Sequence, residues 1–483
     1  MPARRACAIS ARSARVRNTQ TGSVSIPAAL HAALDASVPA EASGLVVGLS
    51  GGPDSAALLR ATAALGKNFR ALPLRAVHID HGLQPAAADF RAACERLCGQ
   101  LRIPLRIVAA AVAQDAGLSI EAAARDARYA ALAAEIQPGE CLLTAHHRQD
   151  QAETLLLQAL RGAGVKGMSA MPVCRPFGPG WHVRPLLDVA HGDLEQFGEL
   201  ERYASIDSSI DPSVDSSVEP SIDPMNQDLR FDRVYLRTAV WPLIEKRWAG
   251  AAIALTRAAR HMAEAQRLLE MAAGADVARL RDGDALSIPG LRALPALKRV
   301  NAVRLWVSQE GLEAPSTARL IEALRQVFDA EADHQPAIVW GGHALRRYRQ
   351  RLFVTRADPP RAPDSLSWIP VAGSSLELGP ALGNLSWIAQ RGGLAADRLP
   401  DSLIVRRREG GETLKPAPSA RTQTVQHLCQ ALGVLPWMRD ALPLVFAGDE
   451  LIAVADLWLD ARWCTAANAL GLGVAWNNAP VVT

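Results

Sequence analysis

The chain has 483 residues, of which 49% are hydrophobic and 21% are charged, and its formal net charge is +3. This length exceeds what one hydrophobic core usually serves, so we expect two or three domains. No apolar stretch is long enough to span a bilayer, which argues against a membrane protein, and the small net charge permits a nucleic-acid partner without demanding one.

The first segment, residues 1–25, contains five arginines and no acidic residue. Such a composition is typical of a transit peptide or a solvated tail, and we expect a disordered basic tail or a start codon placed too early. A basic arm that touches RNA is the weaker alternative. The seven cysteines of the chain include no CxxC pair, which indicates a reducing compartment and therefore a cytoplasmic protein.

An apolar run over residues 44–49 predicts a strand, and residues 56–65 read as a helix. The turn between them consists of Ser50, Gly51, Gly52, Pro53, Asp54 and Ser55. The two glycines let an anion approach backbone N–H groups at the start of the helix, so the turn predicts a phosphate cradle. The aspartate can cap the helix or hold Mg²⁺. The absence of GxxxxGK[ST] excludes a Walker loop, and an ordinary glycine turn is the alternative.

Short apolar runs alternate with alanine-rich helical patterns up to about residue 161. We expect strands at 45–49, 74–79, 105–110 and 141–145, which together predict a parallel α/β sheet. Ligands of such sheets bind beyond the carboxyl ends of the strands. The side chains expected there are His78, Asp80 and His81 on the second strand and His146 and His147 on the fourth.

The fourth strand leads into a helix that carries Asp150 and Glu153 three residues apart, on one face. Two carboxylates at this place can hold Mg²⁺ or a substrate ammonium. Acidic residues also stabilise a first helical turn, but beside a phosphate cradle we favour the functional interpretation. A zinc site made from the histidines of both strand ends is conceivable, although no spacing matches a structural or protease site.

Between residues 205 and 224 a four-residue unit of serine, an aliphatic residue, an acid, and serine or proline recurs. A period of four fits neither a helix stripe nor a strand, so this repeat predicts a flexible acidic insertion. The residues after 240 show other patterns. Amphipathic patterns predict a helical domain over 241–358 that ends in a basic run at 346–351, suited to RNA phosphates or forming a solvated edge. Short strands punctuated by proline and glycine predict a small α+β domain over 359–483.

The turn sequence SGGPDS resembles the PP-loop of ATP pyrophosphatases. A longer ordered set of motifs resembles the bacterial tRNA(Ile)-lysidine synthetase family in its long form. Its members here are SGGPDS, HIDHGL from His78, Glu121 with ARDARY from Ala124, HHRQDQAET from His146, RPLL from Arg184, NQD with RFDR from Asn226, and PWMR from Pro436. The resemblance implies a parallel-sheet PP-loop domain, like the adenine nucleotide alpha hydrolases, over 26–240, then tRNA-binding domains at 241–358 and 359–483.

The resemblance further implies ATP-dependent ligation of L-lysine to C2 of the cytidine at the first anticodon position of a CAU-bearing tRNA(Ile), with AMP and pyrophosphate as products. Mg²⁺ is expected near Asp54, and formation of a homodimer is left open. The implied residue roles are ATP binding by residues 50–55 and His78, catalysis or lysine binding by His146, His147, Asp150 and Glu153, and contact with tRNA or the activated base by Arg125, Arg233 and Arg237.

The chain departs from the family pattern at Arg233-Val234, where an Arg-Asn pair is usual. Two other functions fit parts of the sequence. An amidotransferase-type or thiolating PP-loop enzyme is disfavoured because CxxC pairs and an N-terminal cysteine nucleophile domain are absent. A noncatalytic RNA-binding protein with a relic nucleotide fold is disfavoured because the turn at 50–55, Asp150 and Glu153 are intact.

Overall fold

The computed structural model describes residues 26–66, 69–80, 87–110, 120–206, 229–330 and 336–480. The expected basic tail at 1–25 and nearly all of the acidic repeat at 205–224 lie outside these residues. The chain forms two compact units, residues 1–268 and 269–483, and each is described by itself. No helix in the described ranges combines the length and apolar character needed to cross a bilayer.

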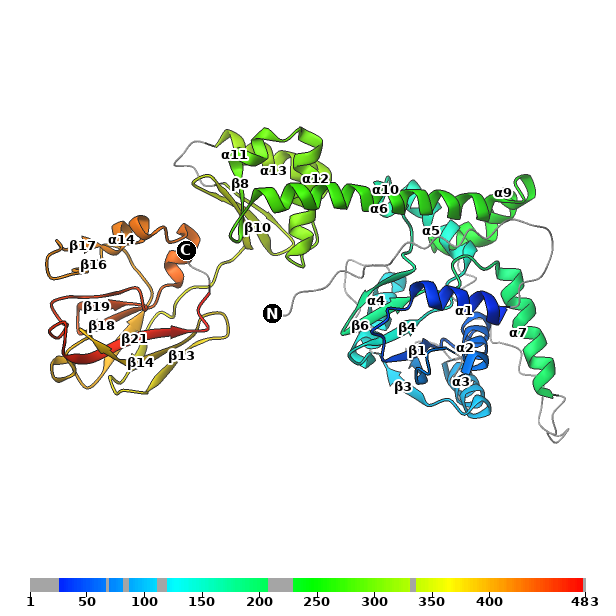
Figure 1. Cartoon of the computed structure of the whole chain (residues 1–483), viewed down its shortest axis with the longest axis horizontal. Coiled ribbons are helices and arrows are strands. Elements are labelled where there is room, and N and C mark those ends of the chain that lie inside the picture. The colour runs from blue at the N-terminus through cyan, green and yellow to red at the C-terminus, as the bar shows by residue number, and fades with distance from the viewer. Residues whose placement is uncertain are drawn as a thin grey trace. The chain divides into compact units, whose positions relative to one another are not determined.

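The first unit is built on one six-stranded sheet with the order β3-β2-β1-β4-β6-β5 (Figure 1). Its strands pair in parallel, except that the edge strand β5 is antiparallel to β6. The parallel sheet and its four predicted strands are therefore confirmed, whereas β5 and β6 were not predicted. The strands are β1 (Gly44–Gly48), β2 (Leu74–Asp80), β3 (Leu105–Ala109), β4 (Glu140–Leu143), β5 (Cys174–Phe177) and β6 (Gly180–Val183).

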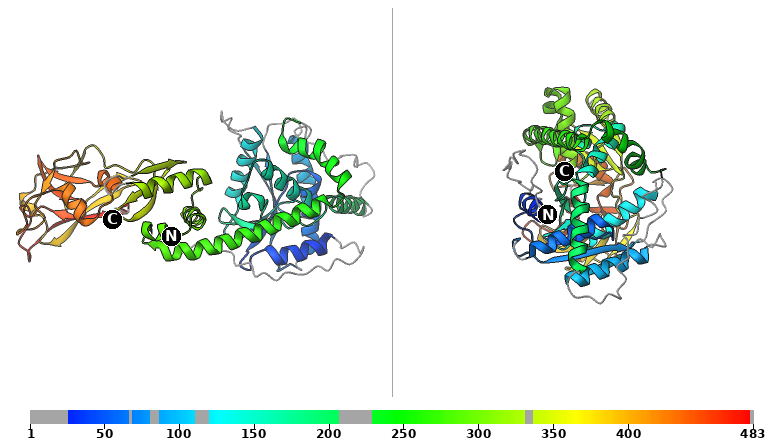
Figure 2. Two further views of the ribbon diagram at one scale, coloured as in Figure 1. Left: turned by 90° about the horizontal axis from the view of Figure 1, so that it is seen from above. Right: turned by 90° about the vertical axis from the view of Figure 1, so that its right-hand side faces the viewer.

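Helices cover both faces of this sheet, as Figure 1 and Figure 2 show. Leu45 and Val47 of β1 pack with one set of helices, while Val46 between them packs with α4 on the opposite face. A strand buried on both faces needs apolar residues at every position, which explains the unbroken hydrophobic run in the sequence. The first face is covered by α1 (Ile26–Ser37), α2 (Pro53–Leu65), α3 (Ala87–Leu101) and α7 (His191–Ile206), and the second by α4 (Ile120–Glu135).

The helix that follows β4 is α5 (Arg148–Leu160), and a later helical segment packs against it. That segment contains one wide π-helical turn, and its Trp241 joins Ala152 of α5 in a small apolar cluster. This packing brings a segment more than eighty residues downstream next to the end of β4. The remaining helices of the first unit are α6 (Val165–Met168), α8 (Asp232–Tyr235), η3 (Leu236–Val240), α9 (Trp241–Arg247) and the first part of α10 (Ala251–Leu280).

The second unit begins with helices and an antiparallel sheet. The amphipathic helices predicted for the helical domain over 241–358 are present, and five strands that were not predicted, in the order β7-β8-β11-β10-β9, accompany them. Charged residues in these strands interrupt the alternation of hydrophobic and polar residues that would have indicated strands in the sequence. The helices are α11 (Ile288–Ala293), α12 (Ala296–Gln309) and α13 (Thr317–Asp329), and the strands are β7 (Arg281–Asp282), β8 (Ala285–Ser287), β9 (Ala337–Trp340), β10 (His343–Tyr348) and β11 (Arg351–Arg356).

The basic run at 346–351 lies on the hairpin formed by β10 and β11. Arg347 is buried and donates to the carbonyls of Val327 and Ala330, and Arg346 donates to Thr355 and to a backbone carbonyl. At least these two guanidiniums therefore hold the fold of the unit together rather than forming an open basic edge.

The last part of the second unit is an α+β domain, as predicted from the short strands. Its core stacks Trp368 on Trp387 with ring centroids 4.1 Å apart. The sheets, in pairing order, are β12 (Leu366–Trp368), β15 (Leu403–Arg406), β18 (Leu444–Ala447), β19 (Glu450–Val454) and β20 (Trp458–Leu459); β13 (Ser375–Gly379), β14 (Gly383–Arg391) and β21 (Leu470–Asn477); and β16 (Thr413–Leu414) with β17 (Gln423–Thr424). The helical elements are η4 (Ala396–Arg398), α14 (Val425–Leu432) and η5 (Pro436–Ala441).

Candidate active site

The predicted phosphate cradle connects β1 to α2. Ser55 accepts a hydrogen bond from the backbone N–H of Ser50 and donates to the carbonyl of Gly52, at 3.1 and 3.0 Å, and the two serine hydroxyls are 3.0 Å apart. Gly52 is the N-cap of α2 and Pro53 is its first residue. The hydrogen bonds of the two serines thus hold the loop in its conformation. The loop leads directly into the N-terminus of α2, which is where an anion site requires free backbone N–H groups.

Gly51 is required by the geometry of this loop. Its φ of +88° is unfavourable for other residues, and a Cβ at this position would lie 2.8 Å from the Cδ1 atom of Phe90. The close neighbour that requires glycine here is the aromatic side chain of Phe90 in α3, and close approach of a phosphate to Gly51 stays a prediction.

His78 lies in β2 and is 4% exposed. Its Nδ1–H donates to the carbonyl of Leu49 at 2.8 Å, at the point where β1 passes into the cradle. The ring therefore holds the end of β1 in position. This buried contact favours a supporting role, and direct contact of His78 with ATP stays a prediction.

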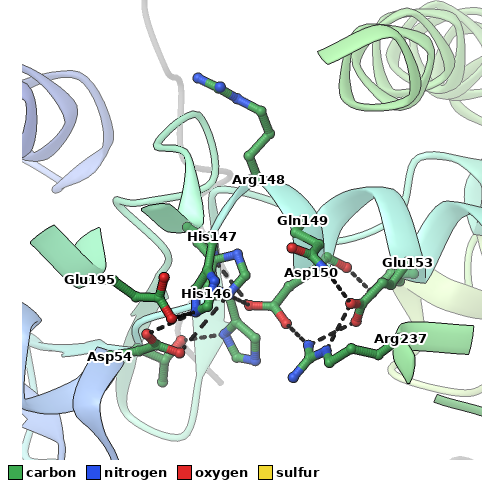
Figure 3. A network of polar contacts seen from close by, with 12 residues as sticks. Asp54, His146, His147, Arg148, Gln149, Asp150, Glu153, Glu195 and Arg237 are labelled. Carbon is green, nitrogen blue, oxygen red and sulfur yellow. Dashed lines mark hydrogen bonds and ion pairs between the residues drawn. The ribbon is translucent and has the colours of Figure 1, made fainter. Parts of the chain in front are cut away.

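Asp54, in the first turn of α2, lies near His147 (Figure 3) and near His191. Its carboxylate oxygens lie 3.5 Å from Nε2 of His191 and 3.9 Å from Nε2 of His147. The hydrogen bond to Asp54 raises the pKa of His191 against the effect of burial, whereas burial lowers the pKa of His147 despite the nearby carboxylates of Asp150 and Asp54. His191 begins α7 and was not among the predicted site residues.

Asp150 and Glu153 lie on one face of α5, as predicted, and each is bound by the same two arginines. Arg237 donates to Asp150 and to both oxygens of Glu153, all at 2.8 Å, and Arg233 donates to Asp150 at 2.9 Å and to Glu153 at 3.2 Å. Glu153 is fully buried. Figure 3 shows Arg237 reaching between the two carboxylates.

The charges of this cluster stabilise one another. Burial alone would raise the pKa of Asp150, but His147 and Arg233 lower it to about 2. Burial alone would lower the pKa of Arg237, but its hydrogen bonds to Glu153 raise it. The structure thus brings the predicted lysine-binding acids and the predicted tRNA-contacting arginines into one site.

A second polar chain leads away from His146. Arg184 donates to Nδ1 of His182 at 3.2 Å, and Thr144 Oγ1 lies 2.8 Å from both His182 Nε2 and His146 Nδ1. A guanidinium can only donate, so His182 Nδ1 must accept, and its Nε2–H must donate to the Thr144 hydroxyl. Arg184 therefore fixes the tautomer of the His182 ring.

Both histidines in this chain are neutral at physiological pH. Burial, together with the positive charges of Arg184 and Arg233, lowers the pKa of His146 to about 3 against the opposing effect of Asp150. Burial, Arg184 and Arg175 lower the pKa of His182 to about 2. A neutral His146 can accept or pass on a proton, but it adds no positive charge to bind a phosphate.

Arg125 lies on α4 beside this chain. Its guanidinium is 5.2 Å from the ring centroid of Tyr129, and Arg128 approaches the same ring at 5.5 Å. Tyr129 packs against Phe177 and His182, so α4 adds positive charge and aromatic surface to the end of β6. Arg125 is exposed and available to a ligand, as a contact with tRNA requires.

Sequence reasoning missed three site residues: Thr144, His182 and His191. Thr144 lies two residues before the paired histidines, so its position at a strand end was the available signal. His182 lies on β6, two residues before the RPLL motif. His191 belongs to no recognised motif, and only the approach of α7 to α2 places it in the site.

A parallel sheet whose first strand leads through a glycine-rich cradle into a helix, with charged side chains at the strand ends, defines a PP-loop nucleotide-binding protein. Comparison with known families agrees. Residues 27–244 match the family described as PP-loop domain, residues 286–353 match the TilS substrate binding domain, and residues 403–476 match the TilS substrate C-terminal domain.

The chain belongs to the tRNA(Ile)-lysidine synthase family, in the long form with a C-terminal domain, and the resemblance seen in its motifs is confirmed. It is 37% identical to the tRNA(Ile)-lysidine synthase of Alkalilimnicola ehrlichii over 86% of this chain and 90% of the relative. For that of Coxiella burnetii the values are 35%, 90% and 92%, and for that of Xanthomonas axonopodis pv. citri 38%, 88% and 95%.

Proposed function

We propose that this protein ligates L-lysine to C2 of the first anticodon cytidine of a CAU-bearing tRNA(Ile), with conversion of ATP to AMP and pyrophosphate. One observation carries the proposal beyond family membership. His147 Nε2 lies 3.4 Å from Asp150 and 3.9 Å from Asp54, so a single side chain separates the phosphate cradle from the acid–arginine cluster. Adenylation and amine attack need their two sites this close together.

The first step adenylates the base. The cytosine O2 attacks the α-phosphorus of ATP, the bond to the bridging oxygen breaks, and pyrophosphate leaves toward residues 50–55. Backbone N–H groups at the start of α2 stabilise its negative charge. The carboxylate of Asp54 lies in the first turn of α2, beside this cradle, and its oxygens are the ligand type that would suit Mg²⁺. When bound, that cation neutralises charge on the departing pyrophosphate.

The second step attaches lysine. The ε-amine attacks C2 of the activated cytidine, the C2–O2 bond breaks, and AMP leaves with the former base oxygen. L-Lysine carries one carboxylate and two amines, and the cluster of Asp150, Glu153, Arg233 and Arg237 offers two charges of each sign for it to bind. Ionised Asp150 can also hold the lysine ammonium in place by an ion pair before it is deprotonated.

The tRNA itself is proposed to bind to Arg125 in the first unit and to the later domains, 241–358 and 359–483. Support comes from the matched substrate-binding family over residues 286–353 and from the exposure of Arg125. Arg233 and Arg237 form ion pairs with Asp150 and Glu153 in this structure. Their contact with the activated base is therefore proposed to form only after lysine has bound to these carboxylates. A cytoplasmic location accompanies this proposal because the tRNA substrate is there.

The test is incorporation of radiolabelled lysine into a CAU-bearing tRNA(Ile) transcript with ATP and Mg²⁺. A transcript with uridine at the first anticodon position should remain unlabelled, and pyrophosphate release should accompany labelling. The variant Asp150→Asn should lose lysine incorporation while it keeps its circular dichroism spectrum. The exposed Asp89→Asn on α3 serves as the matched control. Near-normal labelling by Asp150→Asn would refute the role of this residue, and labelling of both transcripts would refute the base assignment.

A further inference from the structure

The helical segment formed by α8, η3 and α9 has two different faces. Its inner face binds the carboxylates of α5 through Arg233 and Arg237. Tyr235 and Leu243 lie eight residues apart on the other face, and their side chains are 52% and 69% exposed. Side chains that are four or eight residues apart share one face of a helix. One segment therefore completes the acid–arginine cluster on one side and presents an apolar surface on the other.

The exposed aromatic side chains are concentrated on this segment. Trp248 follows the end of α9 and is 61% exposed. Among the phenylalanine, tyrosine and tryptophan side chains that the structure describes, Tyr235 and Trp248 alone are exposed, and the others are buried or half-buried. Exposed apolar side chains that gather in one place mark binding surfaces, whereas single scattered ones do not. The segment therefore has the character of an interaction surface.

Positive charge accompanies these rings. The guanidinium of Arg247 lies 5.7 Å from the ring centroid of Trp248, and Lys246 is the preceding residue. Glu245 is the one acidic residue in the sequence 236–250. The earlier Asp232 forms an ion pair with Arg161 at 3.0 Å, which neutralises its charge. Aromatic rings next to cationic side chains are typical of surfaces that bind unpaired nucleotides, because the rings stack on bases and the cations bind phosphates.

The location of the surface favours RNA over another partner. The inner and outer faces of one helix are about 10–12 Å apart, a distance that a few unpaired nucleotides span. The proposed reaction brings a cytidine to the acid–arginine cluster on the inner side of this helix. The nucleotides next to that cytidine in an unpaired loop then lie within reach of the outer side.

We propose that Tyr235, Trp248 and Arg247 form a stacking surface for the anticodon-loop nucleotides that flank the reacting cytidine. The two rings stack on bases, and Arg247 and Lys246 bind the phosphates between them. Stacking on aromatic rings tolerates any base, so this surface holds the loop open without selecting its sequence. The identity of the loop rests on the proposed function. Binding of unpaired RNA does not, because it needs neither ATP nor lysine.

The test measures fluorescence anisotropy of a labelled RNA hairpin with the CAU anticodon in its loop, titrated with the full-length protein without ATP or lysine. A blunt RNA duplex of equal length is the comparison ligand, because it offers phosphates but no unpaired bases. Wild type should bind the hairpin more tightly than the duplex. Tyr235→Ala and Trp248→Ala should each weaken hairpin binding by about ten-fold and change duplex binding by less than about two-fold.

Three further variants make the result specific. Tyr235→Phe and Trp248→Phe keep an aromatic ring, so each should retain most of the hairpin affinity that the alanine variant loses. Val173→Ala shortens an exposed apolar side chain directly before β5 and should change the affinity for neither RNA. Circular dichroism checks that each variant is folded, and sedimentation compares its oligomeric state with that of wild type.

Equal hairpin affinity in wild type and in both alanine variants would overturn the proposal, and so would a wild type that does not prefer the hairpin. A change of oligomeric state in place of RNA affinity would also overturn it, and would assign the surface to a second copy of the chain. None of these results would remove lysine ligation by wild type. Conversely, hairpin binding that depends on both rings in a protein that incorporates no lysine would support the surface and refute the proposed function.

Discussion

Acidification should destabilise the first unit through His182. This imidazole is fully buried, accepts a hydrogen bond from Arg184 and donates one to Thr144, so the folded protein holds it neutral. Burial and the nearby arginines lower its pKa from 6.5 to about 2. Below pH 6.5 the His182 side chain is protonated in the unfolded chain but not in the folded chain. The contribution of neutral His182 to the free energy of unfolding is therefore complete above pH 6.5 and is lost progressively down to about pH 2.

The magnitude follows from the pH interval. At pH 5.0, about 1.5 pH units below the ordinary histidine value, protonation favours the unfolded state by about 2 kcal/mol, at about 1.4 kcal/mol per pH unit. His146, whose pKa is lowered to about 3, adds a similar loss. Asp150, with a pKa of about 2, remains ionised over this interval and contributes no change.

The measurement compares wild type with His182→Asn. The asparagine oxygen can still accept from Arg184 but does not titrate. Urea unfolding of the full chain is followed at pH 7.5 and pH 5.0, and the transition of the first unit is recognised because ATP shifts it to higher urea. The variant should be less stable at pH 7.5, and its deficit should shrink by about 2 kcal/mol at pH 5.0. An equal deficit at both pH values would refute the reasoning, since the contribution of His146 is common to both proteins.

Three further substitutions have expected outcomes. Gly51→Ala should cost about 1–3 kcal/mol, from its positive φ and the clash with Phe90, and should abolish ATP binding measured by calorimetry. Arg237→Ala leaves the buried Glu153 with fewer donors, so it should lower the stability of the first unit by about 2 kcal/mol in urea unfolding and raise the KM for lysine. Asp460→Asn should lower the melting transition of the second unit by calorimetry, at a cost of about 3 kcal/mol, because this buried carboxylate accepts backbone and guanidinium hydrogen bonds.

Each of these variants has a matched control in the chain. Gly66→Ala at the far end of α2 also has a positive φ but no neighbour to clash with, so ATP binding should persist. Arg161→Ala removes only an exposed ion pair, and Asp449→Asn changes an exposed acid. If a control variant had the same effect as its partner variant, the effect would be caused by helix strain or by charge in general. The specific contact would then not explain the result.

Much of the first unit could be predicted because a strand that is buried on both faces of a sheet has hydrophobic residues at every position, and such a run is visible in the sequence. Leu45, Val46 and Val47 formed an unbroken apolar run, and the cradle that follows contains the residues that a helix N-terminus with a bound anion needs. The strands at 281–356 could not be predicted in the same way. β10 and β11 carry arginines whose guanidiniums bond to carbonyls, so hydrophobic alternation is weak there.

The site was predicted as separate clusters, and the sequence did not reveal how they combine. Asp150 and Glu153 were recognised from their helix spacing, but Arg233 and Arg237 were assigned to RNA, because the contact between α8 and α5 spans eighty residues. His191 could not be recognised at all. A lone histidine at the start of a helix has no local signal, and only tertiary packing gives it its partners.

The hydrogen-bonded chain from Arg184 through His182 and Thr144 to His146 has an evolutionary consequence. Each group is the hydrogen-bond partner of the next, so a substitution at one position leaves its buried neighbour without a partner. Pairs of changes along this chain should therefore combine non-additively. A lineage that replaces one of these residues is expected to replace others with it, and the four positions should vary together or remain fixed together.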